Sequence, residues 1–269
     1  MPSQPAPPPR LGRARFSGRG VPPLTYIGHW NRQPPVWLEG RAGLEYLRLL
    51  RDPIFKGAGV PPGQGAPVLL IPGFMAGDGS MLVLRNWLLR AGYYVELTGL
   101  VFNIRYSELV AMAIGLRLAA LHELLERPVT LIGHSRGGIL AKVVADRHPE
   151  AVDRVITLGS PLRDPYDVHP LTMAGVRVAH VLNFIRYAQR SGVERSFLDE
   201  LEAPAKRPLV SIYSRSDGIV HWEACLREDV MCLEVSGSHV GLGVNLEVYR
   251  LLARLLAAPP RPRARAVAS

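Results

Sequence analysis

One pentapeptide in the chain has residue types that could support nucleophilic catalysis: Gly133-His134-Ser135-Arg136-Gly137. A serine exposed on a sharp turn between a strand and a helix needs an unfavourable backbone conformation. Glycines two positions before and after it let the strand and the helix approach closely. The apolar segment Val129–Ile132 leads into this turn, and residues that favour a helix lead out of it. We therefore predict that Ser135 is an exposed nucleophile; the alternative is a glycine-rich turn with an incidental serine.

Two segments further along the chain could supply the base and the acid that activate Ser135. A serine hydroxyl is a poor nucleophile near neutral pH, so it needs a base that an acid orients. Asp217 follows the apolar segment Leu209–Tyr213, and His239 follows the apolar segment Met231–Val235. This is the order nucleophile, acid, base expected for a serine on such a turn. Since parallel strands end at one edge of a sheet, we expect the three side chains to meet there.

Other histidines are alternative bases. His221, four residues after Asp217, is the main rival, and we expect it to line the rim of the site with Trp222. His134 adjoins the nucleophile, so we expect it to pack beside the site. We expect the following histidines on helix surfaces: His122, His148 and His180.

A nucleophilic attack on a carbonyl also needs two backbone N–H groups that face the developing negative oxygen. The Arg136 amide stands at the start of a predicted helix, whose dipole favours an anion. The second amide is expected from the turn Pro72-Gly73-Phe74, at Phe74; the alternative is an ordinary glycine turn.

Short, continuously apolar segments alternate with helical patterns along the chain. This alternation predicts a mostly parallel sheet with helices on both faces. The expected strands are Val68–Ile71, Tyr94–Leu97, Val129–Ile132, Val155–Leu158, Leu209–Tyr213 and Met231–Val235. The expected helices are Trp37–Leu50, Ser80–Arg90, Glu108–Glu126, Gly137–Arg147 and Leu246–Leu256.

Residues 161–208, after the fourth expected strand, interrupt the alternation. They contain no evident strand and two expected helices, Thr172–Arg190 and Glu194–Leu201. An insertion at this place would lie over the carboxyl ends of the strands, where ligands bind in open α/β sheets. We therefore predict a small helical cap. An apolar set on its main helix either packs on the core or binds an acyl chain: Leu171, Met173, Val176, Val181, Leu182, Phe184 and Ile185.

Composition predicts one globular domain over residues 24–258, with tails at 1–23 and 259–269. The chain has 269 residues, 48% of them hydrophobic, and a formal net charge of +9. Eight arginines in residues 1–20 and 254–269 account for most of this charge, so we expect no nucleic-acid function. No signal peptide or long apolar run is evident, which favours a cytoplasmic protein with at most peripheral membrane contact. No metal-ligand spacing or phosphate loop appears, so we expect no metal and no cofactor.

The chain has two cysteines, Cys225 and Cys232, seven positions apart between the proposed acid and base. A disulfide would hold the Asp217 and His239 loops in register. Reduced thiols are equally compatible with the sequence, because cytoplasmic cysteines are normally reduced. The sequence leaves this choice open.

Five segments around these residues resemble those of bacterial α/β-hydrolases of the lipase and acyl-esterase type. They are Leu70-Ile71-Pro72-Gly73-Phe74, Ile132-Gly133-His134-Ser135-Arg136-Gly137-Gly138, Leu158-Gly159-Ser160-Pro161, Ser216-Asp217-Gly218-Ile219-Val220 and Gly237-Ser238-His239-Val240-Gly241-Leu242. The resemblance runs from about Val68 to Leu256. It implies a catalytic triad of Ser135, Asp217 and His239 and oxyanion amides from Phe74 and Arg136.

The same resemblance implies a serine esterase or lipase that cleaves a small-molecule or lipid ester through an acyl-enzyme. The chain departs from the family pattern at Pro72, where many lipases carry a histidine. In addition, the strands that usually open this fold are not evident before Val68. A reduced sheet is therefore expected. An acyltransferase or thioesterase could use the same site, and a non-catalytic binding protein could share the fold. Acyl length, head group and oligomeric state stay open.

Overall fold

The computed structural model describes residues 34–187 and 191–257, and these form a parallel six-stranded sheet in the order β2-β1-β3-β4-β5-β6. Every neighbouring pair in the sheet is parallel. The strands are β1 (Pro67–Ile71), β2 (Tyr94–Leu97), β3 (Val129–His134), β4 (Val152–Leu158), β5 (Leu209–Tyr213) and β6 (Met231–Glu234). Within the described residues no strand precedes β1, in line with the sequence expectation. The tails expected at 1–23 and 259–269 lie outside the described residues.

Helices follow the strands as the alternation predicted. They are α1 (Ala42–Arg51), α2 (Leu82–Arg90), α3 (Ser107–Leu125), α4 (Arg136–Arg147), α5 (Pro170–Tyr187), α6 (Ser191–Glu202) and α7 (Leu246–Ala257). The first expected helix begins as a 3-10 helix, η2 (Val36–Arg41), before it continues as α1. Gly40 and Gly43 in this stretch weaken a regular α-helical start.

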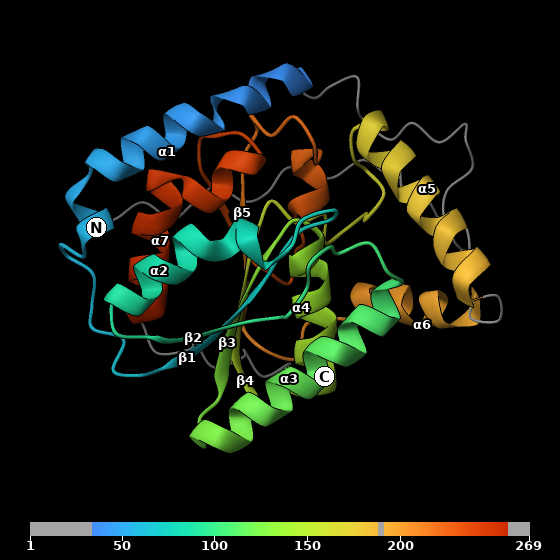
Figure 1. Cartoon of the computed structure of the whole chain (residues 1–269), viewed down its shortest axis with the longest axis horizontal. Coiled ribbons are helices and arrows are strands. Elements are labelled where there is room, and N and C mark those ends of the chain that lie inside the picture. Colours follow the sequence, from blue (N-terminus) through green and yellow to red (C-terminus); the bar gives the residue numbers. More distant parts are fainter. Residues whose placement is uncertain (1–33, 188–190, 258–269) are drawn as a thin grey trace, which may run out of the picture.

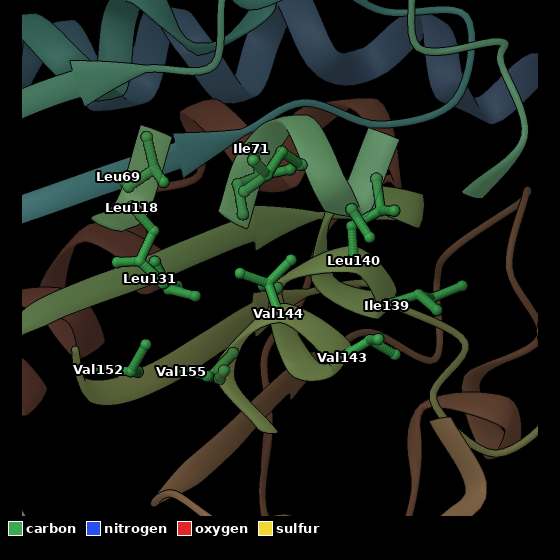
Figure 2. Close-up of a cluster of buried hydrophobic side chains, with 14 of the residues drawn as sticks. Leu69, Ile71, Leu118, Leu131, Ile139, Leu140, Val143, Val144, Val152 and Val155 are labelled. Carbon is green, nitrogen blue, oxygen red and sulfur yellow. The ribbon is translucent and has the colours of Figure 1, made fainter. Parts of the chain in front are cut away.

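The sheet is covered on both faces, with α3, α4 and α6 on one face and α1, α2 and α7 on the other (Figure 1). The side chains of strand β1 contact the helices on both faces of the sheet, because successive side chains of a strand point to opposite faces. Leu69 and Ile71 pack under α3 and α4, whereas Val68 and Leu70 pack under α2 and α7. Figure 2 shows the first of these clusters, in which side chains of α3 and α4 gather over those of the strands. A strand buried on both faces therefore needs the continuous apolar run seen in the sequence.

The cap consists of α5 and α6, inserted between β4 and β5. Helix α6 is tied to the body by buried charges: the Lys142 ammonium, 1% exposed, donates to the carbonyls of Glu200 and Ala203. Arg147 bridges Glu108 of α3 and Glu200 of α6. The second helix of the cap is therefore anchored to both α3 and α4.

The apolar set predicted on α5 does not form one inward face. Met173 is buried and Val176 is partly buried, but the other five members are more than half exposed. The exposed members are Leu171, Val181, Leu182, Phe184 and Ile185. Because the helix is apolar on nearly every side, its periodicity could not indicate which side faces inward.

Candidate active site

Ser135 stands in a strained turn between β3, which ends at His134, and α4, which begins at Arg136. Its backbone has φ 54° and ψ −125°, a conformation that residues with a side chain rarely adopt. A Cβ on Gly133 would overlap the backbone of Gly137, and a Cβ on Gly137 would overlap the Ile71 carbonyl. The two glycines of the motif are therefore needed for the strand and helix to meet.

Asp217 and His239 form a close pair at the same edge of the sheet. Asp217 Oδ2 lies 2.6 Å from His239 Nδ1, and the two residues are 2% and 4% exposed. The other carboxylate oxygen of Asp217 accepts hydrogen bonds from the amides of Ile219 and Val220 at 2.8 and 2.7 Å. A carboxylate so oriented accepts the Nδ1 proton, which leaves the Nε2 lone pair of His239 available as a base.

The environment of His239 favours its protonated form. Burial lowers the pKa of the imidazole, but the charge and hydrogen bond of Asp217, together with the charge of Glu39, outweigh burial. The net effect raises the pKa of His239 above its ordinary 6.5. A raised pKa makes the imidazole a stronger base once it has lost its proton.

His134 and Gly159 connect Ser135 to this pair. The rings of His134 and His239 are 4.9 Å apart between centroids, and His134 Nε2 lies 2.9 Å from the His239 carbonyl oxygen. The Ser135 amide donates to the carbonyl of Leu158, and a Cβ on the next residue, Gly159, would lie 3.1 Å from both Asp217 Oδ2 and His239 Nδ1. The three residues predicted from the sequence thus gather at one edge of the sheet.

The turn after β1 approaches the Ser135 turn closely. A Cβ on Gly73 would lie 3.1 Å from the Ser135 Cβ. Within the described part of the chain the Phe74 amide has no hydrogen-bond acceptor, whereas the next amide, of Met75, donates to the Asn103 carbonyl. Arg136 occupies the first position of α4, where helix amides have no acceptor within the helix. The Phe74 and Arg136 amides, predicted from the sequence as an oxyanion site, thus belong to two turns that meet at Ser135.

Asn103 holds this arrangement and was missed by sequence reasoning. Its side chain is fully buried, and its amide nitrogen donates to the Pro72 carbonyl at 2.9 Å. The Arg136 guanidinium donates to both the carbonyl and side-chain oxygens of Asn103, each at 2.9 Å. Asn103 lies in an irregular segment without a recognisable pattern, so only the fold reveals its role.

A largely apolar cavity of about 110 Å³ opens beside Ser135, between the cap and the edge of the sheet. Helix α5 contributes one side of its surface at helical spacing: Thr172, Val176, Ala179, His180 and Asn183. Other lining residues are Phe74, Phe197 and Ile219. The expectation that His180 lies on a helix surface is wrong, because it lines the cavity and packs edge-on against Tyr106 at 5.7 Å.

The expected position of His221 at the rim is also wrong. His221 is 2% exposed, and its Nδ1 lies 3.3 Å from Asp167 Oδ2. Its backbone amide donates to the Asp167 carbonyl, so the residue fastens the cap segment to the Asp217 loop. The two cysteines left open by the sequence are free thiols, and burial raises the pKa of Cys225 well above its ordinary value.

In the described ranges, no cluster of three or more histidine, cysteine or carboxylate groups has a geometry suited to a metal ion. No helix within those ranges combines the length and hydropathy needed to cross a bilayer.

Comparisons with known proteins concern the family and the fold. Residues 104–203 match the family model described as a PGAP1-like alpha/beta domain. No curated protein matches the sequence.

Among solved structures, the chain resembles Bacillus licheniformis lipase BlEst2 in its mature form, with a TM-score of 0.55 and 15% identity over 74% of this chain and 94% of that one. It also resembles Aspergillus fumigatus lipase B, with a TM-score of 0.54 and 16% identity over 75% of this chain and 55% of that one. At this identity the likeness is one of fold.

Proposed function

We propose that the chain is an α/β-hydrolase, which its fold and its match to a PGAP1-like alpha/beta domain support, and that it hydrolyses carboxylic esters through an acyl-enzyme on Ser135. The observation that carries this proposal is the strained Ser135 turn, which faces an apolar cavity at the edge where Asp217 and His239 pair. A strained backbone persists only where the surrounding structure holds it, and such strain concentrates at functional sites.

The proposed mechanism assigns each of these groups a role as a proton donor or acceptor. His239 Nε2 removes the hydroxyl proton while Ser135 Oγ attacks the ester carbonyl carbon. The carbonyl oxygen becomes an oxyanion that the amides of Phe74 and Arg136 stabilise. The imidazolium then protonates the leaving alkoxide, the ester C–O bond breaks, and an acyl-enzyme and a free alcohol result. Asp217 stays ionised throughout and stabilises the imidazolium.

The second half of the reaction uses the same groups with water. His239 removes a proton from water, whose oxygen attacks the acyl carbon of the acyl-enzyme. The second tetrahedral intermediate breaks the bond to Ser135 Oγ, which takes back the proton from His239. The products are a carboxylic acid and the free serine, so the cycle closes without a cofactor.

The cavity supports an ester with an apolar acyl group as the substrate. Its lining is mostly hydrocarbon, and burial of apolar surface is the main source of binding free energy in such a pocket. An acyltransferase or thioesterase would form the same acyl-enzyme and differ only in the acceptor or the leaving group. Product analysis with water, alcohol and thiol acceptors therefore distinguishes these activities.

The decisive experiment combines a covalent probe with an activity panel. A fluorophosphonate probe should label the wild type and Ser80→Ala, an exposed serine used as the matched control, but not Ser135→Ala. Wild type and Ser80→Ala should also release p-nitrophenol from esters of graded acyl length. Labelling of Ser135→Ala at the wild-type rate, or absence of any hydrolysis by the wild type, would contradict the proposal.

A further inference from the structure

The Glu39 carboxylate contacts both loops that carry the proposed acid and base. Glu39 Oε1 accepts hydrogen bonds from the amides of Gly218 and His239 at 2.9 and 3.0 Å. Glu39 Oε2 accepts a hydrogen bond from the amide of Val240 at 2.8 Å. One half-buried side chain of η2 thus bonds to the residue after Asp217 and to His239 itself.

A second carboxylate supports the first one. Glu45 of α1 is 7% exposed and accepts from the Ser238 amide and hydroxyl at 2.9 and 3.3 Å. Arg41, between the two carboxylates in sequence, donates to the Ser216 carbonyl at 2.8 Å and lies 3.4 Å from Glu45. The segment η2–α1 therefore touches the residue before Asp217 as well as the residue before His239.

The catalytic loops lack side chains where these carboxylates approach. A Cβ on Gly218 would lie 3.1 Å from Glu39 Oε1, closer than ordinary packing allows. A Cβ on Gly241 would overlap Glu45 Oε2. Glycine at both positions lets a carboxylate reach the backbone amides, and such charge-assisted hydrogen bonds are stronger than neutral ones.

We propose that Glu39 is a positioning residue, whose carboxylate sets the spacing of the Asp217 and His239 loops and helps to hold the imidazolium of His239. This inference rests on the proposed ester hydrolysis, because it assigns Glu39 an effect on the base of that reaction. A misplacement of about 1 Å at a reacting group costs on the order of 100-fold in rate. A carboxylate that fixes both loops at once therefore has a large effect on turnover without contact with the substrate.

The charges that face His239 determine what happens when Glu39 is replaced. These groups are Asp217 from the loop after β5, Glu39 from η2 and His134 from β3, while Glu45 of α1 bonds to the preceding residue, Ser238. Glu39 raises the pKa of His239, so the loss of its charge shifts the imidazole toward a lower pKa. A residue that only stabilised the fold would change the melting temperature and leave this pKa in place.

The kinetic test uses Glu39→Gln and Glu39→Ala with Glu247→Gln as the matched control. Glu247 also bonds to the loop before His239, through the Ser236 amide and hydroxyl, but does not touch His239. We expect kcat to fall about tenfold in Glu39→Gln, which keeps the Oε1 acceptor, and toward 100-fold in Glu39→Ala. KM should change little, because Glu39 does not line the cavity. The pH at which activity rises should move downward in both variants and stay unchanged in Glu247→Gln.

A second measurement is independent of activity. NMR titration should report a lower pKa for His239 in both Glu39 variants, and the amides of His239 and Val240 should exchange faster with solvent in Glu39→Ala. If folded variants keep the wild-type pKa and exchange rates, the positioning role is wrong, whatever the activity. If the wild type hydrolyses no ester but the NMR changes occur, the Glu39 contacts stand and the proposed hydrolysis fails. Unchanged kcat and pH dependence in an active Glu39→Ala would also overturn the role.

Discussion

Two regions approach the carboxyl edge of the sheet from different parts of the chain, and they do so with opposite chemistry. The N-terminal brace, η2 and α1, reaches the Asp217 and His239 loops through carboxylates bonded to backbone amides. The cap, α5 and α6, covers the space beside Ser135 with mostly apolar side chains. Under the proposed hydrolysis, one region holds the acid and the base, and the other provides room for a substrate.

This difference predicts how amino-acid substitutions in each region should affect activity. Hydrogen bonds to a carboxylate depend on distance and direction, so a shift of the brace is transmitted to the loops it contacts. Apolar contact depends mainly on area and shape, so the cap can accept substrates of different length. We therefore expect substitutions in the brace to change turnover for every ester alike, and substitutions in the cap cavity to change the choice of ester.

The largest effect is expected when the proposed nucleophile, Ser135, is replaced, because both regions act on the reaction at this residue. Ser135→Ala should lower kcat on the order of 10⁴- to 10⁶-fold and leave the fold intact, because triad groups act as a unit. Steady-state assays with circular dichroism as the folding control measure this. Brace or cap substitutions added to Ser135→Ala should cause no further loss; a further loss would indicate that the two regions serve another site.

A charge placed in the cavity tests the cap. Val176→Asp should lower kcat/KM for long-chain esters about tenfold or more relative to acetate esters, because a charged group disfavours burial of an acyl chain. Val181→Asp on the same helix is the matched control, since Val181 is 56% exposed. Equal losses for all chain lengths, or equal effects of the two substitutions, would contradict the assignment of the cavity to the acyl group.

The pH dependence of the wild type tests the base. His239 must be neutral to accept the Ser135 proton, and its pKa is raised above 6.5. Activity should therefore be low below pH 6.5 and rise on the alkaline side of that value. Profiles of kcat/KM on a short-chain ester, together with a check that the protein stays folded, measure this. A profile that is already flat from pH 5 upward would exclude His239 as the base.

The last prediction concerns the pH dependence of stability, which depends on neither region. Burial, and then the charge of His239, lower the pKa of His134 from 6.5 to about 4. The unfolded chain thus binds more protons between these values, so stability present above pH 6.5 is lost as pH falls toward 4. The loss should reach about 3 kcal/mol. Urea unfolding at several pH values should show this slope in the wild type and a smaller one in His134→Gln; equal slopes would contradict it.

The sequence predicted the elements that depend on local pattern. The strand Tyr94–Leu97 has the predicted bounds, because Gly92 and the following polar turn interrupt the apolar run on both sides. The Ser135 turn could be predicted equally well, because its strand, glycines and helix are contiguous in the sequence. The Asp217 and His239 loops could be found because each directly follows an apolar strand.

What the sequence could not predict depends on contacts across the fold. No spacing rule relates Glu39 to His239, which lie 200 positions apart. The inward side of α5 could not be identified, because apolar residues occur on nearly every side of the helix. His221 was misplaced because its partner Asp167 lies in an irregular segment of the cap, where the backbone path follows from packing rather than from periodicity.

The wide sequence separation within the Glu39 contacts has a consequence for the order in which the protein can be made. Gly218, His239 and Val240 follow Glu39 by 179, 200 and 201 positions. At about 5–20 residues per second, a ribosome needs roughly 10 to 40 s to add the residues that separate Glu39 from His239. During that interval the β1, β3 and β4 strands and the Ser135 turn have already emerged without the contacts of the brace. The nascent chain therefore carries the proposed nucleophile well before the proposed base can be held in place, and activity should appear only after His239 and Val240 have emerged.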